Sequence, residues 1–184
     1  MTLPEPIDWL IEDRPLPHGA TRAVDPGAFR AVLARFCSGI TVVAAQVSGQ
    51  PVGFTCQSFF SVSLDPPLVA FCVSLTSTSY PRIRSAPAFC INVLSSRQRE
   101  HSRTLSSKAP DKWSRVAWTP GADGAVHVEG ALARIDCAPW GEYACGDHRI
   151  VVGRVLHLEA DGPGEPLLYF DSRYRVLDPV PPED

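Results

Sequence analysis

The chain has 184 residues, of which 45% are hydrophobic and 20% charged, and its formal net charge is -3. This length and composition are typical of one globular domain with a sizeable core. The slightly negative charge gives no general reason to bind nucleic acid or an anionic membrane. No apolar run reaches the roughly 18 residues of a membrane span, and the first residues lack the basic and apolar regions of a signal peptide. We therefore expect a cytoplasmic protein with neither nucleic acid nor membrane as a partner.

The sequence has six cysteines and no C-x-x-C pair. Four of them stand in apolar, strand-like stretches, so we expect small buried residues in a reducing compartment. A disulfide framework and a structural zinc site are less favoured, because no Cys or His pair has the spacing of a zinc finger. We therefore expect no metal site. The cysteines are Cys37, Cys56, Cys72, Cys90, Cys137 and Cys145.

The chain divides by composition into an irregular N-terminal arm over residues 1–24, one domain over residues 25–178 and a tail over residues 179–184. The arm contains several prolines and at most one expected helical turn, over residues 7–11. A proline-rich segment without clear hydrophobic periodicity favours irregular structure.

A helix is predicted at the start of the domain, over residues 25–36. Asp25 can cap it, and Pro26 suits its first turn. Its apolar side chains recur at helical spacing, at Phe29, Val32, Leu33 and Phe36.

Strands dominate the rest of the domain. Two further helices are expected, a short one over residues 79–85 and a longer one over residues 95–105. The connections between strands are mostly too short for repeated βαβ crossovers, which favours a mostly β protein, an antiparallel, Greek-key-like barrel with a few peripheral helices. Strands are predicted over residues 40–47, 51–54, 68–73, 89–94, 126–129, 131–138, 148–159 and 167–170.

Two clusters of small polar side chains enclose one apolar strand, residues 68–72. The first cluster lies within residues 51–69, and the second follows the strand over residues 74–79. Hydroxyl and amide groups at both ends of a buried strand suggest a ligand with many polar atoms, such as the tail of a flavin. The first cluster comprises Thr55, Gln57, Ser58, Ser61 and Ser63.

Five motifs occur in an order that resembles the flavin reductase-like family. A loose F-C-S-G-I-T-V-V motif comes first, and G-F-T-C-Q-S-F-F-S-V-S-L-D-P-P-L-V begins at Gly53. F-C-I-N-V-L, D-K-W and G-D-H-R-I-V-V-G-R-V follow, beginning at Phe89, Asp111 and Gly146. Together they cover most of the chain.

This resemblance implies an FMN-binding split β-barrel that forms a homodimer with flavin at the subunit interface. Members of the family are mostly reductase components of two-component flavin-dependent monooxygenases, and the chain looks most like the actinobacterial branch that serves aromatic hydroxylases. The resemblance therefore implies an oxidoreductase that uses NADH to reduce FAD or FMN. Reduced flavin would then diffuse to a separate oxygenase.

The resemblance also implies roles for individual residues. His148 is the candidate catalytic residue, with a role in binding or positioning NADH, and Arg173 and Tyr174 are further candidates for contact with the nucleotide. Gly53 and Phe54 would face the nicotinamide. The remaining cofactor-binding candidates are Thr55, Cys56, Gln57 and Ser58 at the ring and ribityl chain, the strand residues Phe71, Cys72 and Val73, and, for the phosphate, Ser77, Thr78, Ser79, Arg103, Thr104 and Lys112.

Each of these residues also has a simpler interpretation. The first cluster fits an edge strand with a polar face, and the hydroxyls before residue 80 fit a helix cap. Arg103 and Lys112 fit solvated surface charges, and His148 fits a structural residue bonded to Asp147. The other histidines have no partner motif, and most are expected at the surface: His18, His101, His127 and His157.

The chain has no G-x-G-x-x-G fingerprint and no separate βαβ module for a dinucleotide. NADH must then bind on the same barrel as the flavin, which favours a flavin that exchanges readily. Two other functions stay open. One is a flavin-carrying electron-transfer or sensing protein without NADH activity, and the other is a split-barrel oxidase with its own substrate.

Overall fold

The computed structural model describes residues 24–178, so residues 1–23 of the predicted arm, the tail and His18 lie outside the described residues. The chain divides into two compact units, Met1–Leu33 and Ala34–Asp184. In the first unit, helix α1 (Pro26–Leu33) confirms the predicted helix but ends three residues earlier than residue 36. Asp25 caps it as expected, since its Oδ1 accepts a 2.8 Å hydrogen bond from the Ala28 amide.

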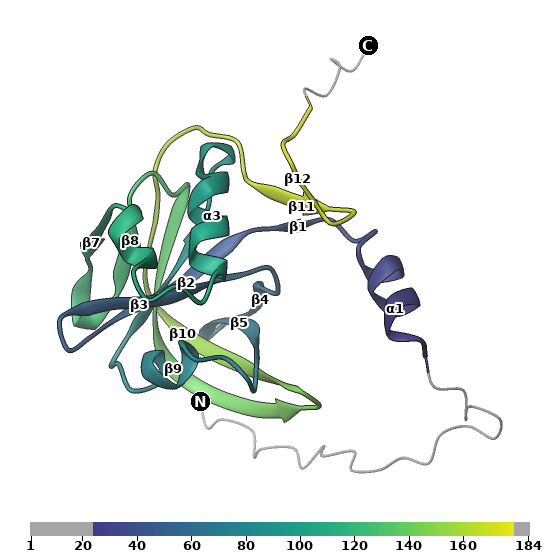
Figure 1. Cartoon of the computed structure of the whole chain (residues 1–184). Coiled ribbons are helices and arrows are strands. Elements are labelled where there is room, and N and C mark those ends of the chain that lie inside the picture. The colour runs from purple at the N-terminus through teal and green to yellow at the C-terminus, as the bar shows by residue number, and fades with distance from the viewer. Residues whose placement is uncertain (1–23, 179–184) are drawn as a thin grey trace. The chain divides into compact units, whose positions relative to one another are not determined.

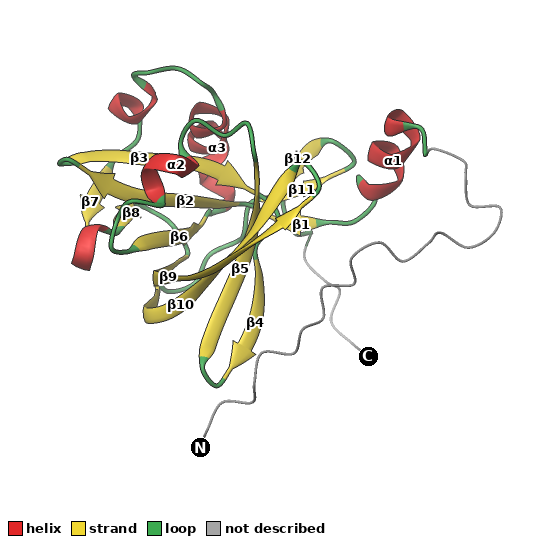
Figure 2. Ribbon diagram, turned by 90° about the horizontal axis from the view of Figure 1, so that it is seen from below, coloured by secondary structure: helices red, strands yellow, loops and turns green. Residues whose placement is uncertain are grey.

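The second unit is built on a seven-stranded sheet in which every neighbouring pair is antiparallel, in the order β3-β2-β6-β9-β10-β5-β4 (Figures 1 and 2). The predicted class, a mostly antiparallel β fold with few helices, is thereby confirmed. The strands are β2 (Thr41–Val47), β3 (Gln50–Cys56), β4 (Phe60–Leu64), β5 (Pro67–Ser74), β6 (Phe89–Val93), β9 (Ala133–Cys145) and β10 (His148–Ala160).

Two small antiparallel sheets and a few short helices complete the unit. Strands β1 (Ser38–Gly39), β11 (Leu168–Phe170) and β12 (Arg173–Arg175) form one small sheet, and β7 (Trp118–Pro120) and β8 (Val126–Val128) form the other. Helix α3 lies against β2 and β3 (Figure 1). The helical segments are α2 (Tyr80–Ile83), η1 (Ser96–Gln98), α3 (Arg99–Ser106), η2 (Lys112–Arg115) and η3 (Ala122–Gly124).

Strand β2 is buried on both faces from Thr41 to Ala45, which explains the apolar run of residues 42–45 within it. Val43 and Ala45 belong to one core cluster, which includes Phe71 and Phe89. Residues that alternate with them, such as Val42, belong to a second cluster, which packs beneath α3 and β8. Because successive side chains of a strand point to opposite faces, only a strand that separates two cores can be apolar throughout.

Asn92 ties three strands together inside the protein. Its side chain is fully buried, and its Nδ2 donates hydrogen bonds to the carbonyl oxygens of Val42 (3.2 Å) and Val126 (3.0 Å). Its Oδ1 accepts a 2.7 Å bond from the Val128 amide. All the polar atoms of this buried amide therefore have partners, as a buried polar group requires.

Several strands differ from the sequence prediction. The short strands β1, β7 and β12 were not predicted, and neither was β4, although its Phe-Ser-Val-Ser-Leu alternation is a strand pattern. Strand β9 begins near the predicted position but continues to Cys145, past the Pro139 that suggested its end. The pairing with β10 shifts there, so that Trp140 is an extra residue between Pro139 and Gly141. A β-bulge of this kind accommodates a proline within a strand.

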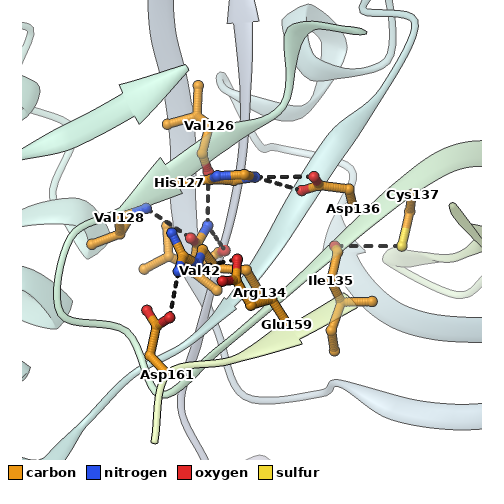
Figure 3. Close-up of polar contacts among 11 residues, drawn as sticks. Val42, Val126, His127, Val128, Arg134, Ile135, Asp136, Cys137, Glu159 and Asp161 are labelled. Atoms are coloured by element: carbon orange, nitrogen blue, oxygen red, sulfur yellow. Dashed lines mark hydrogen bonds and ion pairs between the residues drawn. The ribbon is translucent and has the colours of Figure 1, made fainter. Parts of the chain in front are cut away.

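His127 departs from the expectation that the unassigned histidines lie mostly at the surface. Its imidazole Nε2 lies 2.9 and 3.0 Å from the two carboxylate oxygens of Asp136, a buried residue of β9 (Figure 3). The two residues are nine positions apart in the sequence and have no motif in common, so the sequence alone did not pair them. No helix in the described part of the chain has the length and apolar character needed to cross a bilayer.

Candidate functional site

A cavity of about 560 Å³ opens where the ends of β3 and β5 meet α3 and the β11–β12 hairpin. This volume lies in the range typical of small-molecule sites. Most of the predicted cofactor residues line it, together with the candidate catalytic residue. These are Phe54, Thr55, Cys56, Gln57, Ser58, Cys72, Val73, Ser77, Thr78, Ser79, Lys112, His148 and Tyr174.

Five of the predicted residues are not part of the lining: Gly53, Phe71, Arg103, Thr104 and Arg173. Phe71 is fully buried and packs against Phe54 and Phe89 instead. At Gly53, a Cβ atom would lie only 2.7 Å from the Trp113 ring and 2.8 Å from the Val43 carbonyl oxygen. Gly53 is therefore needed for close packing behind the cavity wall.

The residues that sequence reasoning missed lie mostly on α3 and just beyond it. A polar helix gives no local indication of which face borders a cavity, so only the packing of α3 on β3 identified them. Tyr169 lines the cavity because the pairing of β11 with β12 places it opposite Tyr174. The missed residues are Ser102, Leu105, Ser106, Ser107, Lys108 and Tyr169, whereas Ser74 and Thr76, also in the lining, belong to the second polar cluster of the sequence.

Ser58 joins the end of the polar cluster to strand β5. Its hydroxyl accepts a 2.8 Å hydrogen bond from the Cys72 amide and lies 3.1 Å from the Cys72 carbonyl oxygen, to which it donates. The same hydroxyl lies 3.3 Å from the thiol of Cys56. The Ser58 hydroxyl thus bonds both backbone groups of Cys72, as a neighbouring strand would. These two hydrogen bonds already occupy the donor of this hydroxyl. Burial raises the pKa of the Cys56 thiol, which therefore presents a neutral group to the cavity.

A chain of hydroxyl contacts links three walls of the cavity. Thr55 on β3 donates a 2.7 Å hydrogen bond from Oγ1 to the carbonyl oxygen of Ser102 on α3. The Ser102 hydroxyl in turn lies 3.1 Å from the hydroxyl of Tyr174 on β12. The wall formed by α3 is therefore held to both neighbouring walls by side chains that also line the cavity.

Tyr174 is held on its other sides by cations and by an aromatic ring. The guanidinium carbons of Arg99 and Arg103 lie 5.5 and 5.6 Å from its ring centroid, within the range of cation–π attraction. Tyr169 meets it edge-on, with 5.4 Å between the ring centroids. Arg103 therefore supports a residue of the lining.

Lys112 supplies positive charge to the cavity. Its Nζ donates hydrogen bonds to the carbonyl oxygens of Leu105 (3.1 Å) and Ser107 (3.3 Å), at the C-terminal end of α3. An ammonium group has three donors, so one stays free for an anion. Burial lowers the pKa of Lys112, because desolvation disfavours its charged form.

The loop between β5 and α2 presents hydroxyl groups to the cavity from Ser74 through Ser79. Ser77, rather than Ser79, caps α2, because its Oγ accepts a 3.2 Å hydrogen bond from the Tyr80 amide. The hydroxyl of Thr76 lies 2.9 Å from that of Ser74. The helix predicted over residues 79–85 is only four residues long in the structure, as α2. Any anion site here therefore depends on the hydroxyls and on Lys112 more than on a helix dipole.

His148 stands at the first position of β10, opposite Ser74 on β5 and Cys145 on β9. Its Nδ1 lies 2.7 Å from the Asp147 carboxylate, and this hydrogen bond lowers the pKa of Asp147. His148 also lines the cavity. The simpler bond to Asp147 is therefore present, and the expected contact with NADH stays a prediction.

The arrangement suits a flat, polar-edged ligand with an anionic tail. One wall combines the Phe54 ring with neutral hydroxyls, Lys112 offers a charge, and His148 also lines the cavity. A family model described as "Flavin reductase like domain" matches residues 33–178. The chain belongs to this family.

Relatives in this flavin reductase family are similar to the protein over most of their length. The reductase subunit HsaB of a flavin-dependent monooxygenase from Rhodococcus jostii is 40% identical over 160 residues, which are 87% of this chain and 82% of the relative. The reductase component of 4-hydroxyphenylacetate 3-monooxygenase from Thermus thermophilus is 40% identical over 82% of this chain and 95% of the relative.

A solved structure has the same fold. The NADH:FAD oxidoreductase SgcE6 of Streptomyces globisporus is 35% identical, covers 87% of this chain and 99% of its own, and superposes with a TM-score of 0.80. A second structure of that protein contains NAD and FAD fragments. These comparisons confirm the expected family, split-barrel fold class and enzyme class, so the protein is a flavin reductase.

Proposed function

We propose that this flavin reductase oxidises NADH, reduces FAD or FMN in the cavity described above, and supplies the reduced flavin to a separate monooxygenase component. The observation that carries the proposal is the convergence of the β3 polar wall, Lys112 and His148 on one cavity. Relatives whose names describe monooxygenase reductase components support the link to an oxygenase.

The β3 wall fits the flavin ring. When bound, a flavin accepts a hydride equivalent from NADH, and this transfer requires the two rings to be held face to face within a few ångströms. Phe54 gives the wall an apolar surface, and the segment from Thr55 to Ser58 adds backbone and hydroxyl groups that can stabilise charge at the ring edge. Because Thr55 and Ser58 are fixed by bonds to Ser102 and Cys72, this wall is rigid before a ligand binds.

Lys112 and the hydroxyls of residues 77–79 are the proposed phosphate site. They line the same cavity, and Lys112 keeps one N–H free after it binds the end of α3. A phosphate would also offset the desolvation that lowers the pKa of Lys112. Both FAD and FMN carry a phosphate next to the ribityl chain, so this site alone does not separate them.

His148 is the proposed positioning residue for the nicotinamide. Asp147 bonds to its ring, and His148, at the start of β10, lines the same cavity as the β3 wall. The transfer itself needs no side-chain proton, because the proton taken up by the flavin can come from water. One cavity must then hold both molecules, which favours a flavin that exchanges over one that stays bound.

We further propose that the protein is a cytoplasmic homodimer in which a second copy covers strand β4. This strand ends the sheet, so its outer edge has unpaired backbone groups. It also exposes Phe60, Val62 and Leu64, and the exposed fraction of Leu64 is 95%. An apolar edge strand in a soluble protein requires a partner surface. All six cysteines are free thiols, which suits a reducing compartment.

The test of function is NADH oxidation by extensively dialysed protein with FAD, with FMN and without added flavin. We expect loss of NADH absorbance only when flavin is added. NADH oxidation without addition would contradict an exchangeable flavin. A yellow protein that retains its flavin and never oxidises NADH would instead identify an electron carrier, and oxidation confined to an added organic substrate would identify an oxidase.

A further inference from the structure

Three side chains with metal-binding atoms meet at a second place in the fold. Cys90 on β6, His127 on β8 and Asp136 on β9 each place one such atom within 4.8 Å of the other two. None of the three lines the proposed flavin cavity. The proposed reductase function uses none of them.

The sheet itself creates this cluster. Cys90 and Asp136 are directly opposite each other in the antiparallel pair β6–β9, and side chains of such partners project to the same face. His127 comes from β8, whose preceding residue Ala125 forms a bridge to β2. Figure 3 shows its imidazole directed at the Asp136 carboxylate.

Because the cluster is buried, a negative charge on Asp136 costs free energy unless it is compensated. Cys90 is fully buried, and Asp136 has an exposed fraction of 5%. Among the described residues, the ion pairs of Asp136 include only the one with His127. A carboxylate removed from water requires a nearby positive charge or several hydrogen-bond donors. A protonated His127 is one way to provide it, and a bound cation is another.

We propose that Cys90, His127 and Asp136 bind a zinc ion. A thiolate, an imidazole nitrogen and a carboxylate are a donor set that zinc favours. The two anionic ligands would balance the charge of a divalent ion inside the protein. Tetrahedral zinc separates its ligand atoms by roughly 3.3–3.6 Å, given the usual bond lengths. The Nε2–Oδ distances of 2.9 and 3.0 Å must therefore open by a few tenths of an ångström, and the wider contacts in the cluster must close.

His127 is the most exposed member of the cluster. The His127 side chain keeps 16% of its surface exposed. Gly121 lies against the ring, and a Cβ atom at that position would be 2.5 Å from Nε2. The glycine therefore preserves space beside a ligand atom. Water would complete the coordination, since three protein ligands and one open position are common in zinc sites.

Zinc binding must displace the thiol proton of Cys90. Burial and then the nearby Asp136 carboxylate raise the pKa of this thiol, so the metal-free protein holds it as S–H. Metal coordination reverses this preference, because only the thiolate is a good ligand.

Titration of metal-free protein with Co²⁺ tests the proposal, because Co²⁺ replaces zinc and reports its ligands by absorption. We expect one equivalent of Co²⁺ per chain to produce a thiolate-to-cobalt charge-transfer band with tetrahedral d–d bands, and Zn²⁺ to abolish both. Cys90→Ser should remove the charge-transfer band. His127→Gln should weaken Co²⁺ binding by at least about 100-fold, since loss of a ligand costs more than loss of a residue that only supports one.

Cys145→Ser is the matched control, because Cys145 is exposed and lies opposite His148, where a surface site could also form. This variant should keep the full spectrum. If wild-type protein gives no charge-transfer band, or if the band survives Cys90→Ser and disappears in Cys145→Ser, the proposal is wrong. Should Cys90→Ser fail to fold, His127→Gln decides alone: a spectrum and affinity equal to wild type would overturn the site. NADH oxidation by the same samples is a separate readout, so this result and the proposed function are tested independently.

Discussion

The side-chain oxygen of Thr55 lies 2.7 Å from the carbonyl oxygen of Ser102, and this hydrogen bond holds strand β3 against helix α3 at the cavity. The two residues are 47 positions apart. One is on the wall proposed for the flavin ring, and the other contacts Tyr174 on the opposite wall. The width of the cavity thus depends on a bond between neutral groups.

Thr55→Val should therefore weaken flavin binding and stability together. Valine keeps the shape of threonine but lacks the donor, so we expect a loss of about 1 kcal/mol in the free energy of unfolding. We also expect a several-fold higher Kd for FMN, measured by quenching of flavin fluorescence. Thr119→Val is the control, since Thr119 is exposed on β7 and lies outside the lining. Unchanged stability in Thr55→Val would show that the bond contributes nothing to the wall.

Lys112→Met should weaken binding of FMN but much less that of riboflavin, which lacks the phosphate. A charge-assisted hydrogen bond to phosphate contributes about 1.5–3 kcal/mol, so we expect a roughly 10- to 100-fold higher Kd for FMN. Arg115→Met is the matched control, because Arg115 is an exposed cation on the same short helix and lies outside the lining. Equal losses for FMN and riboflavin would assign Lys112 to packing.

The affinity for FMN should fall at high pH because Lys112 loses its charge there. A lysine is charged below its pKa, and burial lowers the pKa of Lys112 from the ordinary 10.5. The loss should therefore begin at a lower pH than an exposed lysine would give. Fluorescence titrations at a series of pH values should show this decline in wild type and not in Lys112→Met. A decline of equal size in the variant would assign the effect to another group.

His148→Ala should raise the KM for NADH and leave the flavin Kd nearly unchanged. The imidazole is expected to contact the nucleotide, whereas the proposed flavin contacts come mainly from β3, Lys112 and the hydroxyls of residues 77–79. His157→Ala is the control, since His157 is an exposed histidine on the same strand. Steady-state kinetics with varied NADH and a separate flavin titration make the distinction. Equal losses of both affinities would mean that His148 is structural.

Asn92→Leu should destabilise the protein by about 2–4 kcal/mol. Leucine fills a similar volume but leaves the Val128 amide and two carbonyl groups without their buried partner. Chemical denaturation measures the change, with Arg97→Ala as the control, since Arg97 is exposed on η1. A loss below about 1 kcal/mol would mean that water or other groups satisfy these atoms.

The polar cluster after Gly53 was identifiable from sequence because its hydroxyl and amide side chains are close together in the chain. The same pattern could not show that the Ser58 hydroxyl is hydrogen-bonded to the backbone of Cys72. It also could not bring in Ser102, which is distant in sequence and on a helix without apolar periodicity. The pairing of His127 with Asp136 was missed for the same reason, as it depends on how β8 lies against β9.

The sequence by itself determined the family, the antiparallel fold and the strand ends where the candidate cofactor residues gather, because these follow from local composition and ordered motifs. Only the tertiary structure decided which polar side chains are available to a ligand and which are already bonded within the protein. Thr55 bonds Ser102, and Lys112 caps α3 while keeping one donor free. The physical reason is that hydrogen bonding depends on distances of about 3 Å between atoms from distant segments, and strand periodicity fixes the face of a side chain but not its neighbour.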